Sequence, residues 1–149
     1  MIVAAAPKIL VVDDFENLRK LVATFLARLD YAVLQAADGR TAIKLAIAEI
    51  PKLILLDLLL PDMNGMEVAR ELRELSHLKH IPIIGWTANP IPRAQALLRT
   101  SLTDCLLKPV APRVLRALVE RFVPRPQQYI SYSCNTGFLS SPISDNSCS

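Results

Sequence analysis

The sequence has few of the features that mark secreted, membrane-inserted or metal-cluster proteins. It has three cysteines in 149 residues, and their spacing matches no common metal-binding pattern. So few cysteines are typical of a protein that is kept in a reducing compartment. The first seven residues lack a basic segment and are too short for a secretory signal. We therefore expect a cytoplasmic protein.

Long hydrophobic runs and a strong charge of one sign are also missing. The apolar run at residues 53–60 is too short to cross a bilayer and contains Asp57, so no membrane insertion is expected. The 17 Lys and Arg residues exceed the 14 Asp and Glu residues by only three and are scattered along the chain. This balance argues against direct binding of nucleic acid. With 52% apolar residues, the chain is long enough to bury the core of one globular domain.

The chain is organised around residues 53–65. Four apolar residues lead into Asp57, more apolar residues follow, and Pro61, Asn64 and Gly65 then mark a loop. A short apolar run between turn signals is typical of a buried parallel strand. We expect Asp57 at the carboxyl end of that strand, the edge where ligands bind in open α/β sheets. The alternative, that Asp57 only caps the next helix, is less favoured because Asn64 is better placed for that role.

Strand and helix patterns alternate from Lys8 to Phe122. The expected strands are residues 8–12, 32–36, 53–57, 81–87 and 105–107. The expected helices cover residues 18–29, 38–50, 66–75, 93–99 and 112–122, and Asp38 is expected to cap the second of them. Such alternation predicts a parallel sheet with right-handed crossovers and helices on both faces. The predicted fold class is α/β, a flavodoxin-like doubly wound (βα)5 domain with a five-stranded parallel sheet in the order 2-1-3-4-5.

The composition changes after Phe122. Residues 124–149 are rich in Ser, Pro, Asn and Gln and carry almost no charge, which is typical of a flexible tail. We expect a folded domain over residues 1–123 and a tail over residues 124–149. A docking peptide around Tyr129, Tyr132 and Phe138 is the functional alternative.

Polar residues stand at the ends of four of the expected strands. They are Asp13, Asp14, Asp57, Thr87 and Lys108. In the order 2-1-3-4-5 these strand ends are neighbours, so the three carboxylates share one cleft and require a cation. Hard oxygen ligands with open positions suit Mg²⁺, which also coordinates phosphate. With a lysine and a hydroxyl beside them, this group predicts a site that accepts a phosphoryl group on Asp57.

These motifs resemble the response-regulator receiver domain, the phosphoacceptor of two-component signalling. The matching segments are residues 9–14, 57–65, 87–88 and 108–109, and all four in this order are far more specific than any one alone. The resemblance covers roughly residues 8–122. It implies a stand-alone domain that takes phosphate from a sensor histidine kinase or a histidine phosphotransfer protein and signals through contacts with a downstream target protein.

The resemblance also implies a role for each matching residue. Asp57 would be the phosphorylation site and Asp14 a direct ligand of Mg²⁺. Asp13 would act through metal-bound water, and the backbone carbonyl of Leu59 would complete the metal site. Thr87 would be the switch hydroxyl and Lys108 the phosphate-binding lysine, in a Lys108-Pro109 peptide that is often cis in the family. The chain would be a signalling domain rather than an enzyme.

The sequence departs from the family at several positions, among them Cys105, Ser101, Leu59 and Asn89. The family usually has Tyr or Phe three residues before the lysine, and Cys105 stands there. One alternative function is a degenerate receiver that docks on partners without phosphorylation, although no acid or lysine of the site is missing. An aspartate-based phosphatase is disfavoured because Leu59 stands where a second Asp is needed as general acid. Flavin binding is disfavoured because Asp13 and Asp14 would repel the flavin phosphate.

Two histidines fall outside this constellation. His77 and His80 follow the third expected helix, and we expect solvated loop residues rather than a metal pair or a phosphorelay histidine. Trp86, directly before Thr87, is expected to be a buried core residue.

Overall fold

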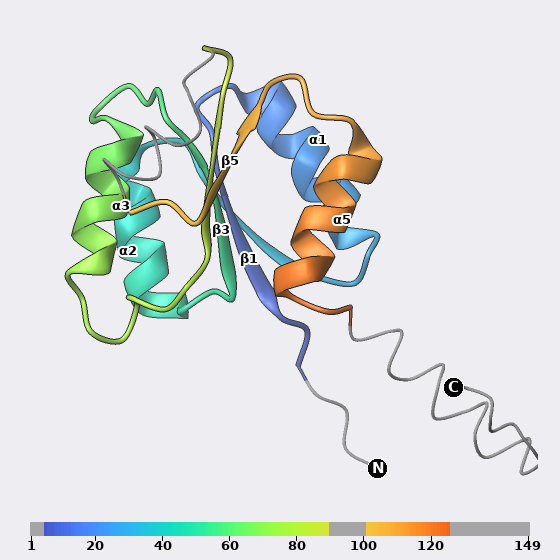
Figure 1. Ribbon diagram of the computed structural model, residues 1–149, viewed down its shortest axis with the longest axis horizontal. Coiled ribbons are helices and arrows are strands. Elements are labelled where there is room, and N and C mark those ends of the chain that lie inside the picture. The colour runs from blue at the N-terminus through green and yellow to red at the C-terminus, as the bar shows by residue number, and fades with distance from the viewer. Residues whose placement is uncertain (1–4, 90–100, 126–149) are drawn as a thin grey trace, which may run out of the picture.

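Five strands and four helices form the part of the chain that the computed structural model describes, residues 5–89 and 101–125 (Figure 1). The strands are β1 (Lys8–Val12), β2 (Ala32–Ala36), β3 (Leu53–Asp57), β4 (Ile83–Thr87) and β5 (Asp104–Leu107). The helices are α1 (Glu16–Ala27), α2 (Gly39–Glu49), α3 (Gly65–Arg73) and α5 (Pro112–Phe122). The helix expected at residues 93–99 and the tail beyond residue 125 lie outside the described residues.

The strands form one parallel sheet in the order β2-β1-β3-β4-β5, which confirms the predicted topology. Figure 1 shows α1 and α5 on one face of the sheet and α2 and α3 on the other. The register pairs Val12 with Leu56 and Asp57 with Trp86. The residues that follow β1 and those that end β3 and β4 are therefore neighbours at the same edge.

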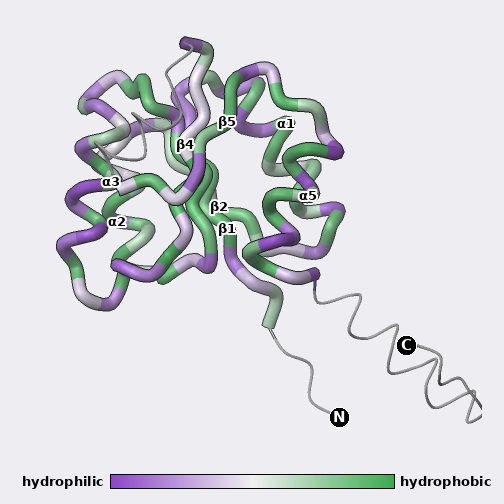
Figure 2. Tube along the Cα trace, viewed as in Figure 1, coloured by the Kyte–Doolittle hydropathy of each residue, from purple (hydrophilic) through white to green (hydrophobic). Residues whose placement is uncertain are grey.

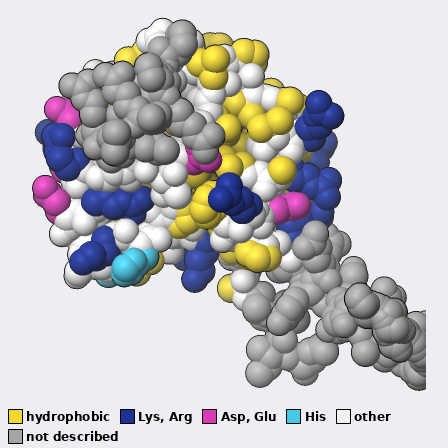
Figure 3. Space-filling model, in the orientation of Figure 1, with side chains coloured by type: hydrophobic (Ala, Val, Ile, Leu, Met, Phe, Trp, Pro, Cys, Tyr) yellow, Lys and Arg dark blue, Asp and Glu magenta, His cyan; other side chains and the backbone are white. Residues whose placement is uncertain are grey.

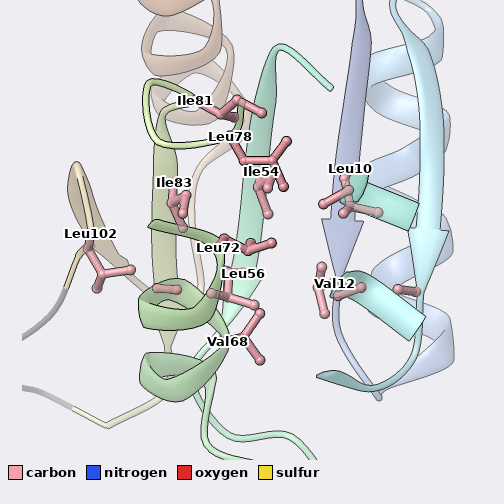
Figure 4. Packing of buried hydrophobic residues seen from close by; sticks show 14 of the residues in the cluster. Leu10, Val12, Ile54, Leu56, Val68, Leu72, Leu78, Ile81, Ile83 and Leu102 are labelled. Atoms are coloured by element: carbon pink, nitrogen blue, oxygen red, sulfur yellow. The ribbon is translucent and has the colours of Figure 1, made fainter. Parts of the chain in front are cut away.

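Burial of the central strands follows from their apolar sequences. All five residues of β3 are buried, and alternate side chains point to opposite faces of a strand. Ile54 and Leu56 pack toward α2 and α3, whereas Leu53 and Leu55 pack toward α1 and α5. Figure 4 shows the first of these clusters, and Figure 2 shows hydrophobic residues concentrated along the strands. A strand buried on both faces has no reason to alternate, which explains its continuous apolar run.

The helix starts follow local capping chemistry. The Asp38 carboxylate accepts a hydrogen bond from the Thr41 amide at 2.8 Å. Asn64 accepts from the Met66 amide at 2.8 Å and forms a capping box with Glu67. Both caps were expected at these residues, and they fix where α2 and α3 begin.

Element boundaries differ from expectation by one or two residues. Strand β4 begins at Ile83 rather than residue 81, because Pro82 has no amide hydrogen to donate to a neighbouring strand. Helix α1 ends at Ala27, and Leu29 lies buried in the turn that follows. Strand β5 begins one residue early, at the buried Asp104. None of the described helices is long and apolar enough to cross a membrane.

Tyr31 ties the start of β2 to the end of α5. Its buried hydroxyl donates to the carbonyl of Val123, and burial is the main cause that raises the pKa of Tyr31 to about 12. The folded protein therefore keeps the phenol neutral at pH values where the unfolded chain ionises it, above its ordinary value of 10.0. We expect the free energy of unfolding to fall as the pH rises from 10 to 12.

The matched variant is Tyr31→Phe. It should lose about 1 kcal/mol at neutral pH, the net value of one hydrogen bond, and should show a flatter decline in the same pH window. Denaturant unfolding of both proteins at several pH values checks this. Parallel declines of the two proteins would contradict it.

Candidate phosphoacceptor and metal site

Three carboxylates meet where β1 and β3 end. One carboxylate oxygen from each of Asp13, Asp14 and Asp57 lies within 4.8 Å of the others. The pairing of β1 with β3 brings them together, because Asp13 directly follows Val12 and Asp57 directly follows Leu56. Asp13 is fully buried, Asp57 is 5% exposed and Asp14 is exposed. The group is a hard-oxygen donor set that opens to solvent on the Asp14 side, which fits Mg²⁺ with its retained waters.

The Asp13 carboxylate is held from two sides. The amide of Phe15 donates to Oδ1 at 2.8 Å, and the ammonium of Lys108 lies 2.7 Å from Oδ2. The guanidinium of Arg19 donates to the backbone carbonyl of Asp13 at 2.9 Å. These contacts fix the turn that presents Asp13 to the cleft.

Among the residues that the structure describes, the Asp57 carboxylate has one amide and one ammonium partner. The amide of Leu59 donates to Oδ1 at 3.0 Å, and Lys108 Nζ lies 3.3 Å from Oδ2. Burial is the largest cause that raises the pKa of Asp57, and the charge of Asp13 raises it further, while the Leu59 amide and Lys108 oppose the shift. A carboxylate that burial makes costly to ionise gains from any cation placed beside it.

Thr87 and Lys108 come from the next two strand ends, as expected. Thr87 is 3% exposed, and its hydroxyl accepts from the Asn89 amide at 3.1 Å. The Lys108 amide donates to the Thr87 carbonyl at 2.8 Å, which joins these two residues through the backbone. The Lys108-Pro109 peptide is cis, as the family resemblance implied.

The loop after β3 is anchored by Asp62, a residue for which no role was predicted. The Asp62 carboxylate accepts from the amides of Gly39 and Arg40 at 2.8 and 3.0 Å, and these bonds lower the pKa of Asp62. It therefore caps the N-terminus of α2 from a distant part of the chain. Leu59, whose carbonyl is the predicted metal ligand, is paired with Asn64 in an isolated bridge within the same loop.

Arg73 is a second anchor that sequence reasoning missed. Its guanidinium donates to the carbonyls of residues Ser101, Lys79 and Ile81 at 2.9, 3.1 and 2.6 Å and to the Thr103 hydroxyl at 3.2 Å. It thereby connects the end of α3 to the segments before β4 and β5. Most of these acceptors are backbone carbonyls, which every residue has. The sequence therefore contains no pattern from which the partners of Arg73 could have been predicted.

An apolar groove of about 590 Å³ lies beside the cleft, between α1 and α5. Leu18, Phe25 and Leu115 form part of its walls, and Trp86 and Lys108 also line it. Figure 3 shows hydrophobic side chains gathered over the region where Figure 1 places β5, α1 and α5. Trp86 is 2% exposed, which confirms the expectation of a buried ring. His77 and His80 are exposed, as expected.

Comparison with known proteins gives one family. The response regulator receiver domain matches residues 9–120. The transcriptional regulatory protein PhoP of Bacillus subtilis is 38% identical over 121 residues, which are 80% of this chain and 50% of that protein. The sensor kinase/phosphatase CqsS of Vibrio cholerae is 37% identical over 118 residues, 78% of this chain and 17% of that protein. The chain thus spans half or less of the length of these curated relatives.

Solved structures agree with this. The chemotaxis protein CheY4 of Vibrio cholerae has a TM-score of 0.75 and 32% identity, covering 80% of this chain and 100% of its own. The receiver domain of a sensor histidine kinase of Pseudomonas aeruginosa has a TM-score of 0.72 and 30% identity, covering 79% of this chain and 98% of its own. That structure holds a magnesium ion coordinated in the active site cleft.

The sheet order and the acidic cleft at its carboxyl edge define a doubly wound α/β protein of the flavodoxin-like class. Within that class, the chain belongs to the response regulator receiver domain family of two-component systems. Receiver domains are signalling domains that bind Mg²⁺ at an acidic pocket and interact with sensor histidine kinases. This chain has an acidic cluster of Asp13, Asp14 and Asp57 at the corresponding edge of the sheet.

Proposed function

We propose that this chain accepts a phosphoryl group on Asp57 from a phosphohistidine. One observation carries the proposal: the ammonium of Lys108 lies within 3.3 Å of both Asp13 and Asp57, and Asp14 completes the acidic cluster. An oxygen of Asp57 forms the bond to phosphorus while the phosphorus–nitrogen bond of the phosphohistidine breaks, and the imidazole nitrogen keeps that electron pair. The product is an acyl phosphate.

The other residues of the cleft stabilise this transfer. Asp14, Asp57 and the carbonyl of Leu59 would hold Mg²⁺ directly, and Asp13 would act on it through water. Bound Mg²⁺ supplies the charge that offsets the phosphoryl oxygens. Lys108 binds another phosphoryl oxygen. The hydroxyl of Thr87 donates a hydrogen bond to the phosphoryl group once that group is attached to Asp57. The donor is a sensor histidine kinase or a histidine phosphotransfer protein, and the phosphorylated domain acts on a downstream target protein in the cytoplasm.

Transfer from a phosphorylated histidine phosphotransfer domain tests this function. Radioactive phosphate should move to this chain when Mg²⁺ is present and should stay on the donor when EDTA removes the metal. Transfer that proceeds equally well in EDTA would contradict the proposed role of the metal.

Mg²⁺ binding should also stabilise the fold. Pairs of carboxylates repel by about 4 kcal/mol at ~4 Å and an effective dielectric constant of ~20, and Mg²⁺ relieves this only in the folded cleft. At ten times its dissociation constant, the ion should add about 1.4 kcal/mol to the free energy of unfolding. Thermal unfolding with and without Mg²⁺ measures the effect. Asp14→Ala should remove the response, and a wild-type protein that ignores millimolar Mg²⁺ would count against the metal site.

A switch at Thr87 should be visible in the fluorescence of Trp86. A beryllofluoride–Mg²⁺ complex stands in for the aspartyl phosphate and should change the emission of this single tryptophan, because the end of β4 rearranges when Thr87 bonds the group. Thr87→Ala should greatly reduce the change. Cys105→Ala should leave it almost intact, because a thiol is too small to replace the aromatic ring usual at that position. Loss of the change in Cys105→Ala, with the complex still bound, would make Cys105 the relay instead.

A further inference from the structure

The ammonium of Lys108 has a third neighbour besides its two carboxylates. It lies over the ring of Trp86, 4.9 Å from the ring centroid. A cation within about 6 Å of an indole face is attracted by the ring quadrupole, and the attraction grows when water is excluded. Trp86 is 2% exposed and the Lys108 side chain 17% exposed. Solvent therefore weakens this contact little.

These three neighbours of the ammonium, Asp13, Asp57 and Trp86, respond differently when Mg²⁺ and a phosphoryl group occupy the cleft. Asp13 and Asp57 are the residues that we assign to the metal and to the phosphoryl group, and both then have new partners. The Trp86 ring offers no oxygen to a hard cation and cannot accept a phosphoryl group. It is therefore the neighbour that stays available to Lys108 throughout the reaction.

We propose that Trp86 is a positioning residue for Lys108. Its indole face holds the ammonium beside Asp57, at the place from which Lys108 binds a phosphoryl oxygen. This role rests on the proposed phosphoacceptor function. It adds a residue that the family motifs do not contain, and it assigns the contribution to the ring face rather than to packing alone.

The backbone fixes both members of the pair relative to Asp57. Trp86 is the register partner of Asp57 on the neighbouring strand, and its carbonyl accepts from the Leu58 amide at 3.2 Å. Lys108 is tied to Thr87, the residue after Trp86, by the 2.8 Å bond from its amide. The ring on β4 and the lysine directly after β5 are thus both fixed on the same side of the acceptor strand β3.

The choice of tryptophan at this position has a cost. Its Nε1 is buried and has no hydrogen-bond partner among the described residues, and a buried donor without an acceptor is destabilising. Leucine or phenylalanine would fill the core here without that penalty. Indole, however, gives the strongest cation–π contact of the aromatic side chains. A role of the ring face toward Lys108 explains why the costlier residue is present.

The sequence allows an unusually direct test, because it contains one tryptophan. Expression of the protein in cells supplied with a fluorinated tryptophan places the analogue at residue 86 and at no other position of the chain. Each fluorine withdraws electron density from the ring face and changes its size little, so the cation–π attraction falls in steps. Labelling by acetyl phosphate in Mg²⁺ should slow with each added fluorine, by about 5-fold to 30-fold in total for the trifluoro form. The unfolding midpoint should stay nearly constant across the series.

Two further measurements separate positioning from packing. The affinity for beryllofluoride in Mg²⁺, which involves no covalent step, should decline with fluorination in the same way. Lys108→Met removes the ammonium and keeps the length of the chain, so fluorination should then have no effect on this affinity. Trp86→Leu should resemble the trifluoro protein if it folds, and the fluorinated series decides the question if it does not.

The outcomes distinguish this role from the function on which it rests. A labelling rate and a beryllofluoride affinity that are independent of fluorination, with Asp57 still labelled, would overturn the positioning role alone. Equal sensitivity to fluorination in Lys108→Met would also overturn it, because the effect would then come from packing. Absence of labelling in the unmodified protein would overturn the phosphoacceptor function and this role with it.

Discussion

Replacement of Asp57 by asparagine is expected to abolish labelling by acetyl phosphate in Mg²⁺. The amide keeps the size of the side chain and can still accept the hydrogen bond that the Leu59 amide gives to Oδ1. It lacks the negative oxygen that attacks phosphorus and weakens the proposed metal site by one charge. Labelling of the variant at more than about 1% of the wild-type rate would show that another residue accepts the group, since loss of the nucleophile removes far more than 100-fold in related chemistry.

The loss of labelling must not result from unfolding of the variant, so its unfolding midpoint is measured as a control. The pKa of Asp57 predicts the result of that measurement. Burial and the charge of Asp13 raise this pKa above the ordinary value of 3.8. A raised carboxyl pKa contributes stability that is present below the unfolded pKa and lost as the pH rises through the folded pKa. At neutral pH without Mg²⁺, Asp57→Asn should therefore unfold at a midpoint at least as high as the wild type. A markedly lower midpoint would contradict the description of Asp57 as a carboxyl group that burial makes costly to ionise.

Gly65→Ala is expected to damage both the fold and the site. A Cβ atom at residue 65 would lie 2.4 Å from the carbonyl oxygen of Asp57 and 2.7 Å from Cα of Leu58. Both atoms belong to the backbone of the acceptor strand and its loop, so either α3 or Asp57 must move. We expect a loss of about 3 kcal/mol in the free energy of unfolding and labelling slowed by about 100-fold, because small misplacements of reacting groups cost rate steeply.

Gly39→Ala is the matched control. The added Cβ would meet Met63 Cγ at 2.4 Å, but that atom belongs to a flexible side chain that can turn aside. The amide of residue 39 still donates to Asp62 in this variant. Denaturant unfolding should show a loss below about 1 kcal/mol, with labelling nearly unchanged. Equal effects of the two substitutions would contradict the claim that close backbone approach at Gly65 shapes the site.

Much of the fold could be predicted because its central elements are set by local sequence. The continuous apolar run before Asp57 indicated a strand buried on both faces, and every residue of β3 is buried. Asp38 and Asn64 identified helix starts because capping acts over two or three residues. The alternation of strands and helices then left one common sheet order, and the ends of β1 and β3 brought Asp13, Asp14 and Asp57 together.

The contacts that sequence reasoning missed all join distant segments. Asp62 caps α2 from 23 residues away, and Arg73 reaches Ser101 across 28 residues. The stacking of Lys108 on Trp86 depends on the register of three strands. Periodicity and capping patterns report only neighbours along the chain, whereas these pairs are decided by which side chains the packed sheet places side by side.

The most direct test of the account is to locate the phosphoryl group. The protein is incubated with Mg²⁺ and acetyl phosphate, the acyl phosphate is reduced with borohydride, and the modified residue is read by tandem mass spectrometry. Asp57 is expected to be the single modified residue, and its modification should be absent when EDTA is present during the incubation. Modification at Asp13 or Asp14 instead, or no Mg²⁺-dependent modification of Asp57, would contradict it.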